Sequence, residues 1–340
     1  MAQSQNAGTT VREMRPVGLA AQRNIFTKTW WILRRYPVIP GIIIVGLIVM
    51  GVFAPQLEPM NPIQQRLNFR NYPPTWGAAR PEYNSKVPNP ADYDMTSVLQ
   101  RTRYKQARNA SFTRTQYILG ADEYGRDVLS RVIEGARISL MLASVALVSG
   151  TIVGTAMGLA AGYFGGWVDE VLMRVLDLWL GLPFLLLALV LVIVLGNSLQ
   201  VMMVLLALLA WVPFVRQVRA DVLVVRTREY VDAARIAGAS NLQIMWRHIL
   251  PGTYSTILVV ASLRVGGLIL AAAALSFLGA GIPDPTPDWG KMVAEGREFL
   301  ATAWWISFWP GFAIFLVVMS LNFFGDWLRD RLDPRLAQID

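Results

Sequence analysis

Residues 229–251 read EYVDAARIAGASNLQIMWRHILP, and they form a polar, basic interruption between two long hydrophobic runs. Short helical patterns lie on either side of Gly238. A helix C-terminus favours glycine because glycine takes a positive φ without strain, so the pattern predicts two short helices joined at this residue. Connections between the helices of a bundle are usually far shorter than this segment. We therefore interpret it as a rigid elbow that another protein grips, rather than as an ordinary connecting loop.

The ends of the two short helices carry capping signals. Thr227 is the expected N-cap of the first helix. Ser240 begins the second, because Gln243 follows it three residues later and completes a capping box. We expect this second helix to end before Pro251, since proline disfavours helical backbone in the residue that precedes it.

The composition is that of an integral membrane protein, because 54% of the 340 residues are hydrophobic and only 16% are charged. A helix needs roughly 20 apolar residues to cross a bilayer. The sequence predicts an all-α integral membrane fold with six transmembrane helices. These lie at about 37–57, 138–163, 175–196, 198–215, 253–279 and 303–325.

Several chemistries are excluded by residues that the sequence lacks. It has no cysteine and one histidine, which excludes disulfides, thiol catalysis, iron–sulfur sites and histidine-based metal clusters. It has no G-x-x-x-x-G-K-[ST] phosphate loop, no G-x-S-x-G elbow and no H-E-x-x-H pair. We expect no enzyme activity, no metal and no cofactor of the chain's own. His248 stands beside Arg247, which favours a surface or docking role over a metal site.

The net charge of +8 is distributed in a way that favours a membrane over nucleic acid. Short segments on one side of the predicted spans are rich in Lys and Arg, whereas those on the other side carry only Lys291 and Arg297. This asymmetry predicts that both termini and the elbow lie in the cytoplasm. The basic residues are Arg12, Arg15, Arg23, Lys28, Arg34 and Arg35 before the first span, and Arg216, Arg219, Arg226, Arg228, Arg235 and Arg247 between the fourth and fifth.

Two segments outside the predicted core have patterns of their own. Residues 1–36 lack the apolar core of a signal peptide, so the first span should remain as an anchor. Within them, Phe26, Trp30, Trp31 and Ile32 predict a short interfacial helix. Residues 58–136 form a large external segment that is irregular to about Thr115. Its end, with Val128, Leu129, Val132 and Ile133 on one face, predicts an amphipathic helix along the outer membrane surface.

The elbow resembles a known family through Asp232-Ala233-Ala234, Gly238 and Leu250-Pro251. These residues are similar to the "EAA" loop of binding-protein-dependent ABC importer permeases, in which the loop is a coupling helix that docks onto a cytoplasmic ATPase. Asp232 stands where Glu is commoner, and His248 stands where Ile is commoner. The run Arg247-His248-Ile249-Leu250-Pro251 resembles the peptide-importer branch of that family.

Further motifs, in the family's order, extend the resemblance over most of residues 117–335. They are Leu119-Gly120, Asp122, Gly125-Arg126-Asp127, Ser130-Arg131 and Gly135-Ala136-Arg137; Asp169-Glu170, Met173-Arg174, Asp177 and Pro183; Leu275-Ser276-Phe277-Leu278-Gly279; Pro285-Thr286-Pro287, Trp289-Gly290 and Met292; and Gly325-Asp326, Leu328-Arg329-Asp330 and Leu332-Asp333-Pro334-Arg335. The chain thus resembles the C-type permease subunit of oligopeptide, dipeptide and nickel ABC importers. Arg174 and Asp177 are expected near a helix start at the cytoplasmic end of the third span, in a structural role.

The resemblance implies a type I ABC importer permease fold and a set of partners. The expected order is a cytoplasmic segment 1–36, a first helix 37–57, the external segment 58–136, a five-helix core 137–327 with its coupling loop at 216–252, and a cytoplasmic tail 328–340. The implied partners are a homologous B-type permease, two ATP-binding subunits that hold ATP and Mg, an external substrate-binding protein and the lipid bilayer. The implied location is a bacterial or archaeal plasma (inner) membrane.

The candidate functional residues form three groups. The coupling residues implied by the resemblance are Asp232, Ala233, Ala234, Arg235, Gly238, His248, Leu250 and Pro251. The alanines would allow close seating in a groove, and Asp232 and Arg235 could pair with charges on the ATPase. A second group, Gly150, Gly154, Gly158 and Gly162, forms a small-residue groove that serves either helix packing within the bundle or a pathway or partner contact.

Arg264 is the third candidate, because it is a charged residue near the middle of the fifth span. The family often has an acidic residue eight positions later on this helix, where this chain has Ala272. Arg264 must therefore find another partner, such as the second permease, or face a water-filled pathway. The alternative is that it bonds a backbone carbonyl between helices.

The function that these observations predict is import of di- or oligopeptides, driven by ATP hydrolysis on partner subunits. Nickel, glutathione or another small solute is the alternative cargo. An ion-coupled secondary transporter is disfavoured, since apart from Asp177 the predicted spans contain no Asp or Glu to hold the ion. A membrane scaffold would have no use for the elbow.

Overall fold

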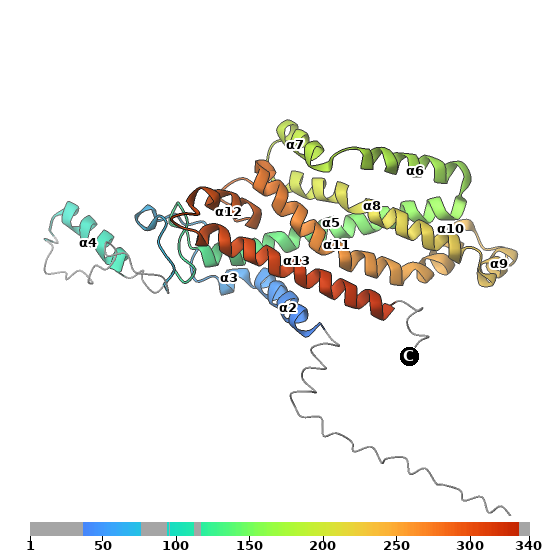
Figure 1. Ribbon diagram of the computed structural model, residues 1–340, viewed down its shortest axis with the longest axis horizontal. Coiled ribbons are helices and arrows are strands. Elements are labelled where there is room, and N and C mark those ends of the chain that lie inside the picture. The colour runs from blue at the N-terminus through green and yellow to red at the C-terminus, as the bar shows by residue number, and fades with distance from the viewer. Residues whose placement is uncertain (1–36, 76–93, 95, 112–116, 333–340) are drawn as a thin grey trace, which may run out of the picture.

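A computed structural model describes residues 37–75, 94, 96–111 and 117–332 of the chain. Regular structure within these ranges is helical (Figure 1). In chain order the helices are α2 (Val38–Val52), α3 (Ala54–Leu57), η1 (Leu67–Phe69), α4 (Val98–Ser111), α5 (Val128–Phe164), α6 (Gly166–Gly181), α7 (Phe184–Leu195), α8 (Leu199–Val225), α9 (Glu229–Ile236), α10 (Asn241–Ile244), η4 (Met245–Ile249), η5 (Leu250–Thr253), α11 (Tyr254–Leu275), η6 (Ser276–Ala280), α12 (Trp289–Gly296), η7 (Arg297–Phe299) and α13 (Trp305–Leu332).

The all-α membrane class is confirmed, whereas the count of six spans is not. Four helical runs in the described ranges are long and apolar enough to cross a bilayer: α5, α8, the run Asn241–Ala280 that contains α11, and α13. The pair α6 and α7 makes up to one further span, but it is bent by 81°. α2 is apolar but only 15 residues long. The expected third span at 175–196 is therefore not one straight helix, because Pro183 separates α6 from α7.

The expected surface helix before the second span is wrong. Residues 128–136 are the first turns of α5, which runs without a break from Val128 to Phe164. Asp127 caps this helix, since its Oδ2 accepts the N–H of Ser130 at 2.8 Å. Val128 and Ile133 are buried in the protein rather than laid on lipid. The apolar face that suggested a surface helix is thus an interior face of a longer helix.

The four glycines of the predicted small-residue groove lie against α8 of the same chain. A Cβ on Gly150 would meet Ala210, and one on Gly154 would lie 2.4 Å from the carbonyl oxygen of Trp211. Gly158 and Gly162 make the same kind of close contact further along α8. Figure 1 shows α5 and α8 side by side over most of their length. The groove is filled inside the molecule, as expected for membrane helices that associate through small residues.

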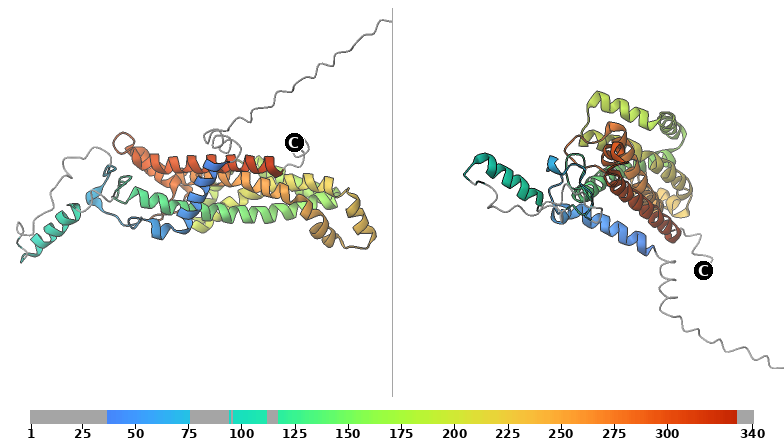
Figure 2. Two further views of the ribbon diagram at one scale, coloured as in Figure 1. Left: turned by 90° about the horizontal axis from the view of Figure 1, so that it is seen from below. Right: turned by 60° about the vertical axis from the view of Figure 1, so that its left-hand side comes forward.

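The external segment has more structure than expected. Residues up to about Thr115 were predicted to be irregular, yet α4 occupies Val98–Ser111 and η1 occupies Leu67–Phe69. The α4 sequence contains no glycine or proline and is rich in Gln, Arg and Ala, which favour helix. Figures 1 and 2 show α4 away from the helical bundle. The predicted interfacial helix at Phe26–Ile32 lies outside the described residues.

The last helix also differs from expectation at its end. α13 continues to Leu332, beyond the expected boundary at 328 between the core and the tail. Asp177 lies in the second half of α6, so the expectation that it stands near a helix start is wrong. Its carboxylate Oδ1 instead accepts a hydrogen bond from Arg216 Nη2 of α8 at 3.0 Å. Arg174 pairs with Glu170 one turn earlier, at 3.0 Å.

Candidate functional site

The elbow lies at one end of the bundle, beyond the end of α8 (Figure 1). α9 ends at Ile236, and Gly238 has φ +80°, as the sequence predicted for a residue that follows a helix C-terminus. Ser240 caps α10, because its Oγ accepts the N–H of Gln243 at 3.3 Å. The two short helices around a glycine are therefore confirmed.

The expected N-cap of α9 is wrong. The residue in that position is Arg228, which makes no hydrogen bond from its side chain to the helix. Thr227 Oγ1 instead donates to the carbonyl oxygen of Val224, at 2.9 Å, and so provides a hydrogen bond to a carbonyl group in the last turn of α8. A threonine hydroxyl can bond backward to a preceding carbonyl as readily as it caps a following helix.

The elbow has one face buried against the bundle and one face exposed. Val231, Ile244 and Ile249 are fully buried, in contact with residues of α5 and α8. On the other face, Ile236, Leu242 and Trp246 are 88%, 63% and 61% exposed. Large apolar side chains with this degree of exposure are available for contact with another molecule.

The predicted coupling residues divide between these two faces. Leu250 is buried and Ala234 is half-buried, so both belong to the anchoring side. His248 is half-buried. The exposed members are Asp232, Ala233, Arg235, Gly238 and Pro251. Asp232 Oδ1 accepts a hydrogen bond from Arg235 Nη1 at 2.8 Å, so these two charges compensate each other in the isolated chain.

The second short helix does not end before Pro251, and that expectation is wrong. Helical backbone continues through a π-helical turn, η4, and a 3₁₀ turn, η5, directly into α11. Pro251 occupies the start of η5, where a missing N–H removes no essential hydrogen bond. Continuous helical backbone therefore joins Asn241 to α11.

A cavity of about 340 Å³ lies beside the bend between α6 and α7 and reaches α8 and α11. Arg264 lines it from the middle of α11, and Arg216 lines it from α8. The other lining residues are apolar or glycine: Trp179, Leu180, Leu182, Phe184, Leu209, Ala210, Val212, Pro213, Gly267 and Leu268. The cavity is thus an apolar hollow with two guanidinium groups.

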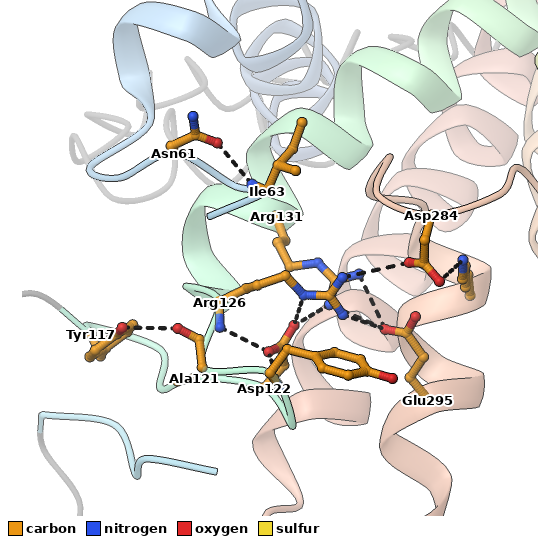
Figure 3. A network of polar contacts seen from close by, with 12 residues as sticks. Asn61, Ile63, Tyr117, Ala121, Asp122, Arg126, Arg131, Asp284 and Glu295 are labelled. Carbon is orange, nitrogen blue, oxygen red and sulfur yellow. Dashed lines mark hydrogen bonds and ion pairs between the residues drawn. The ribbon is translucent and has the colours of Figure 1, made fainter. Parts of the chain in front are cut away.

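At the opposite end of the bundle, where α12 lies (Figure 1), a buried ionic cluster joins the segment before α5 to α12 (Figure 3). Arg126 and Arg131 are 1% and 0% exposed, and both donate to Asp122 Oδ2, the former through Nε at 2.6 Å. Glu295 of α12 accepts from both guanidinium groups, at 3.4 and 3.2 Å. Asp284 lies 3.6 Å from Arg126 and pairs with Lys291 at 2.9 Å.

Reasoning from the residues alone did not identify this cluster as a site. Asp122, Arg126 and Arg131 were noted only as part of a motif. Glu295, which accepts from both arginines, lies more than 160 positions away from them, and no local spacing pointed to it. The available signal was two arginines next to buried apolar positions, which require acidic partners somewhere in the fold.

Another pocket, of about 550 Å³, contains a pair of carboxyl groups. Glu58 and Glu134 both line it, beside Arg137. Burial, together with the hydrogen bond to Glu134 and the charge of Glu134, raises the pKa of Glu58 to about 7. This pair lies where the chain leaves the short helix α3 and meets the first turns of α5.

Comparison with known proteins identifies the family of this chain. Residues 154–338 match the family described as binding-protein-dependent transport system inner membrane component. The chain belongs to this family. It is the permease subunit of an ABC importer, a multi-pass protein of the inner membrane.

Several curated relatives of this permease are similar over most of their length. It is 42% identical to the dipeptide transport system permease protein DppC of Alkalihalophilus pseudofirmus, over 65% of this chain and 73% of that protein. It is 42% identical to the glutathione transport system permease protein GsiD of Pectobacterium atrosepticum, over 64% and 72%. It is 37% identical to the di/tripeptide transport system permease protein DppC of Pseudomonas aeruginosa, over 87% of each. An inward-facing MetNI methionine ABC transporter superimposes with a TM-score of 0.49 at 19% identity, over 59% of this chain and 96% of that one.

Proposed function

We propose that this permease imports di- or oligopeptides together with a homologous second permease. Two cytoplasmic ATPases would bind ATP and Mg, and an external protein would deliver the solute. The proposal places both termini and the elbow in the cytoplasm of a bacterial or archaeal cell. The names of the relatives support the cargo class, since two of those compared are permeases for dipeptides or tripeptides.

One observation carries the mechanism. The elbow offers exposed apolar side chains to a partner, and continuous helical backbone joins it to α11, which lines the cavity at Arg264. ATP-driven closure of the ATPases would move the elbow, and α11 would transmit that movement to the cavity wall. The pathway would then alternate between facing outward and facing inward.

Glutathione is a second candidate cargo, because a relative as similar as the dipeptide permease is named for it. Nickel is a third candidate, and it rests on the family resemblance alone. The test is uptake of a labelled dipeptide, a labelled oligopeptide and labelled glutathione by cells that lack only this chain. Loss and restoration of dipeptide or oligopeptide uptake is expected, whereas loss of glutathione uptake alone would reassign the cargo.

The coupling role of the elbow has its own test. Gly238→Val forces a branched side chain into a left-handed backbone conformation, and Ala233→Asp places a charge on the exposed face. We expect both variants to insert normally and to lose at least about tenfold in transport rate, which corresponds to about 1.4 kcal/mol of activation free energy. A matched control is Ala301→Asp, on an exposed loop that lies far from the elbow. Ala234→Asp, on the half-buried side, tests anchoring and should also abolish transport.

Transport is compared at equal membrane levels, together with the ATPase activity that solute and delivery protein stimulate. Loss of transport with retained assembly is the expected pattern for both exposed-face variants. Wild-type transport in Gly238→Val, Ala233→Asp and Ala234→Asp would show that the elbow does not couple the two activities.

A further inference from the structure

The cavity beside α11 has walls that are apolar except for two arginines. Trp179 and Phe184 come from the two sides of the α6–α7 bend, and Pro213 comes from α8. A volume of about 340 Å³ falls in the range of pockets that hold small organic ligands. The shape and the walls thus suit a small solute that has an apolar body.

The two arginines differ in how their charges are compensated. Arg216 donates to Asp177 at 3.0 Å, so its charge is paired within the chain. Across the part of the chain that the structure describes, Arg264 has no acceptor within hydrogen-bond or ion-pair distance. Its side chain is exposed toward the cavity from the middle of α11. The cavity therefore holds one uncompensated positive charge.

A cation in the middle of a membrane helix is too costly to leave against lipid, and such residues mark pathways or binding sites. A single guanidinium presents parallel N–H donors whose geometry matches the two oxygens of a carboxylate. We propose that this cavity is a binding site on the transport pathway for the carboxylate of the imported solute, with Arg264 as its partner. The proposal rests on the import function proposed above, and it names the chemical group that the pathway recognises.

The alternative is that an acidic residue of the second permease pairs with Arg264 when the importer assembles. In that case the charge is structural and the cavity has no preference for anions. The two cases predict different effects of a small reagent's charge on its reaction rate in the cavity of the assembled importer.

The absence of cysteine from the chain makes this difference measurable. Gly267 lines the cavity three residues after Arg264, so the two side-chain positions are about 5–6 Å apart on the helix surface. A Cβ on Gly267 would meet no atom within 4 Å, so Gly267→Cys introduces a thiol without strain. The matched control is Leu300→Cys, at an exposed position in another part of the chain.

The intact importer, in membranes without nucleotide, is treated with two methanethiosulfonate reagents of similar size, the anionic ethylsulfonate and the cationic ethyltrimethylammonium. We expect the anionic reagent to modify Gly267→Cys faster than the cationic one. The ratio of the two modification rates, anionic over cationic, should fall about tenfold in Arg264→Gln. The ratio at Leu300→Cys should not change. If Arg264→Gln leaves the ratio at Gly267→Cys unchanged, the proposal is overturned in favour of a paired arginine. A Gly267→Cys thiol that neither reagent modifies also overturns it, because the cavity would then be closed to solute.

Protection by solute then tests carboxylate recognition directly. Alanyl-alanine should slow modification of Gly267→Cys by a neutral methanethiosulfonate, its C-terminal amide should not, and Arg264→Gln should abolish the difference. Equal protection by the acid and the amide would overturn the proposal. Protection does not require import, so a dipeptide that protects but is never taken up would refute the peptide cargo and leave the carboxylate site standing.

Discussion

Asp122 is the residue on which the buried ionic cluster depends, because two fully buried arginines donate to the same carboxylate oxygen. Removing one partner of a buried ion pair leaves a charge uncompensated in a medium of low polarity. We expect Asp122→Asn to lower the free energy of unfolding by about 3–5 kcal/mol, because only Glu295 would remain near both guanidinium groups. Unfolding of the purified protein in detergent, followed against denaturant concentration, measures this loss.

The control for that prediction is Glu170→Gln, which removes a pair with Arg174 that is largely exposed. Exposed pairs contribute about 0–1 kcal/mol, so this variant should unfold almost like the wild type. An Asp122→Asn variant as stable as Glu170→Gln would mean that the cluster does not stabilise the fold.

Glu58 gives the stability of the fold a pH dependence whose sign is fixed by the pKa of its carboxyl group. Its pKa is about 7 in the folded chain, above the ordinary value of 4.5, because of burial and of its neighbour Glu134. The fold therefore favours the protonated form, and the stabilisation is complete below about pH 4.5 and is lost as pH rises through about 7. We expect the unfolding temperature to fall over this interval in the wild type. In Glu58→Gln, which stays neutral, the fall should be smaller.

The comparison for Glu58 is Glu298→Gln, at an exposed glutamate, which should keep the slope of the wild type. Equal slopes in wild type and Glu58→Gln would place the pH dependence elsewhere in the chain.

At the scale of single elements, the contact between α5 and α8 is set by glycines. A Cβ on Gly154 would lie 2.6 Å from Cβ of Phe214 as well as against the backbone of Trp211. Overpacking of a close contact costs about 1–3 kcal/mol, so Gly154→Ala should lower the unfolding midpoint in detergent. Gly267→Ala is the matched control, because it adds the same methyl group to a membrane helix where nothing lies within 4 Å. Equal midpoints for the two variants would show that the helices separate without cost.

Helix positions were predictable where a long apolar run coincides with a single element, as in α8 and α13. The predicted end of α8 at about 215 is wrong, because the helix continues to Val225 through residues that belong to the expected coupling loop at 216–252. The sequence also predicted the glycine bend at Gly238 and the cap at Ser240, because both depend on local backbone chemistry. The bend at Pro183 was not predicted, since an apolar run shows where a chain is hydrophobic and not where it changes direction. Hydropathy similarly divided α5 into a surface helix and a span, although its polar first turns are stabilised by the distant residue Glu295.

The continuity of the helical backbone through Pro251 was also not predicted. Proline disfavours an α-helical residue before it, and this is why a helix end was predicted there. The chain instead passes through a π-helical turn and a 3₁₀ turn, which shift the hydrogen-bond pattern without ending the helix. The part of the elbow from Asn241 onward is thus continuous with α11, which only the three-dimensional path of the backbone reveals.

At the scale of the whole molecule, two opposite ends have different characters. The elbow end carries exposed apolar side chains, while the other end holds the buried ionic cluster and α12 (Figures 1 and 3). The asymmetry of Lys and Arg predicts that the elbow end faces the cytoplasm. Single cysteines test this orientation, because the chain has none of its own. Leu300→Cys and Ile236→Cys place one thiol at an exposed position near each end.

In spheroplasts, whose inner membrane is intact, a membrane-impermeant maleimide should label Leu300→Cys and should not label Ile236→Cys. After permeabilisation and removal of the ATPases, both thiols should react, because Ile236 is exposed in the isolated chain. Detergent-solubilised protein serves as the control for the reactivity of each thiol. Labelling of Ile236→Cys from outside would show that the protein has the opposite orientation in the membrane. The elbow could then no longer meet a cytoplasmic ATPase, and the coupling mechanism proposed for it would have to be abandoned.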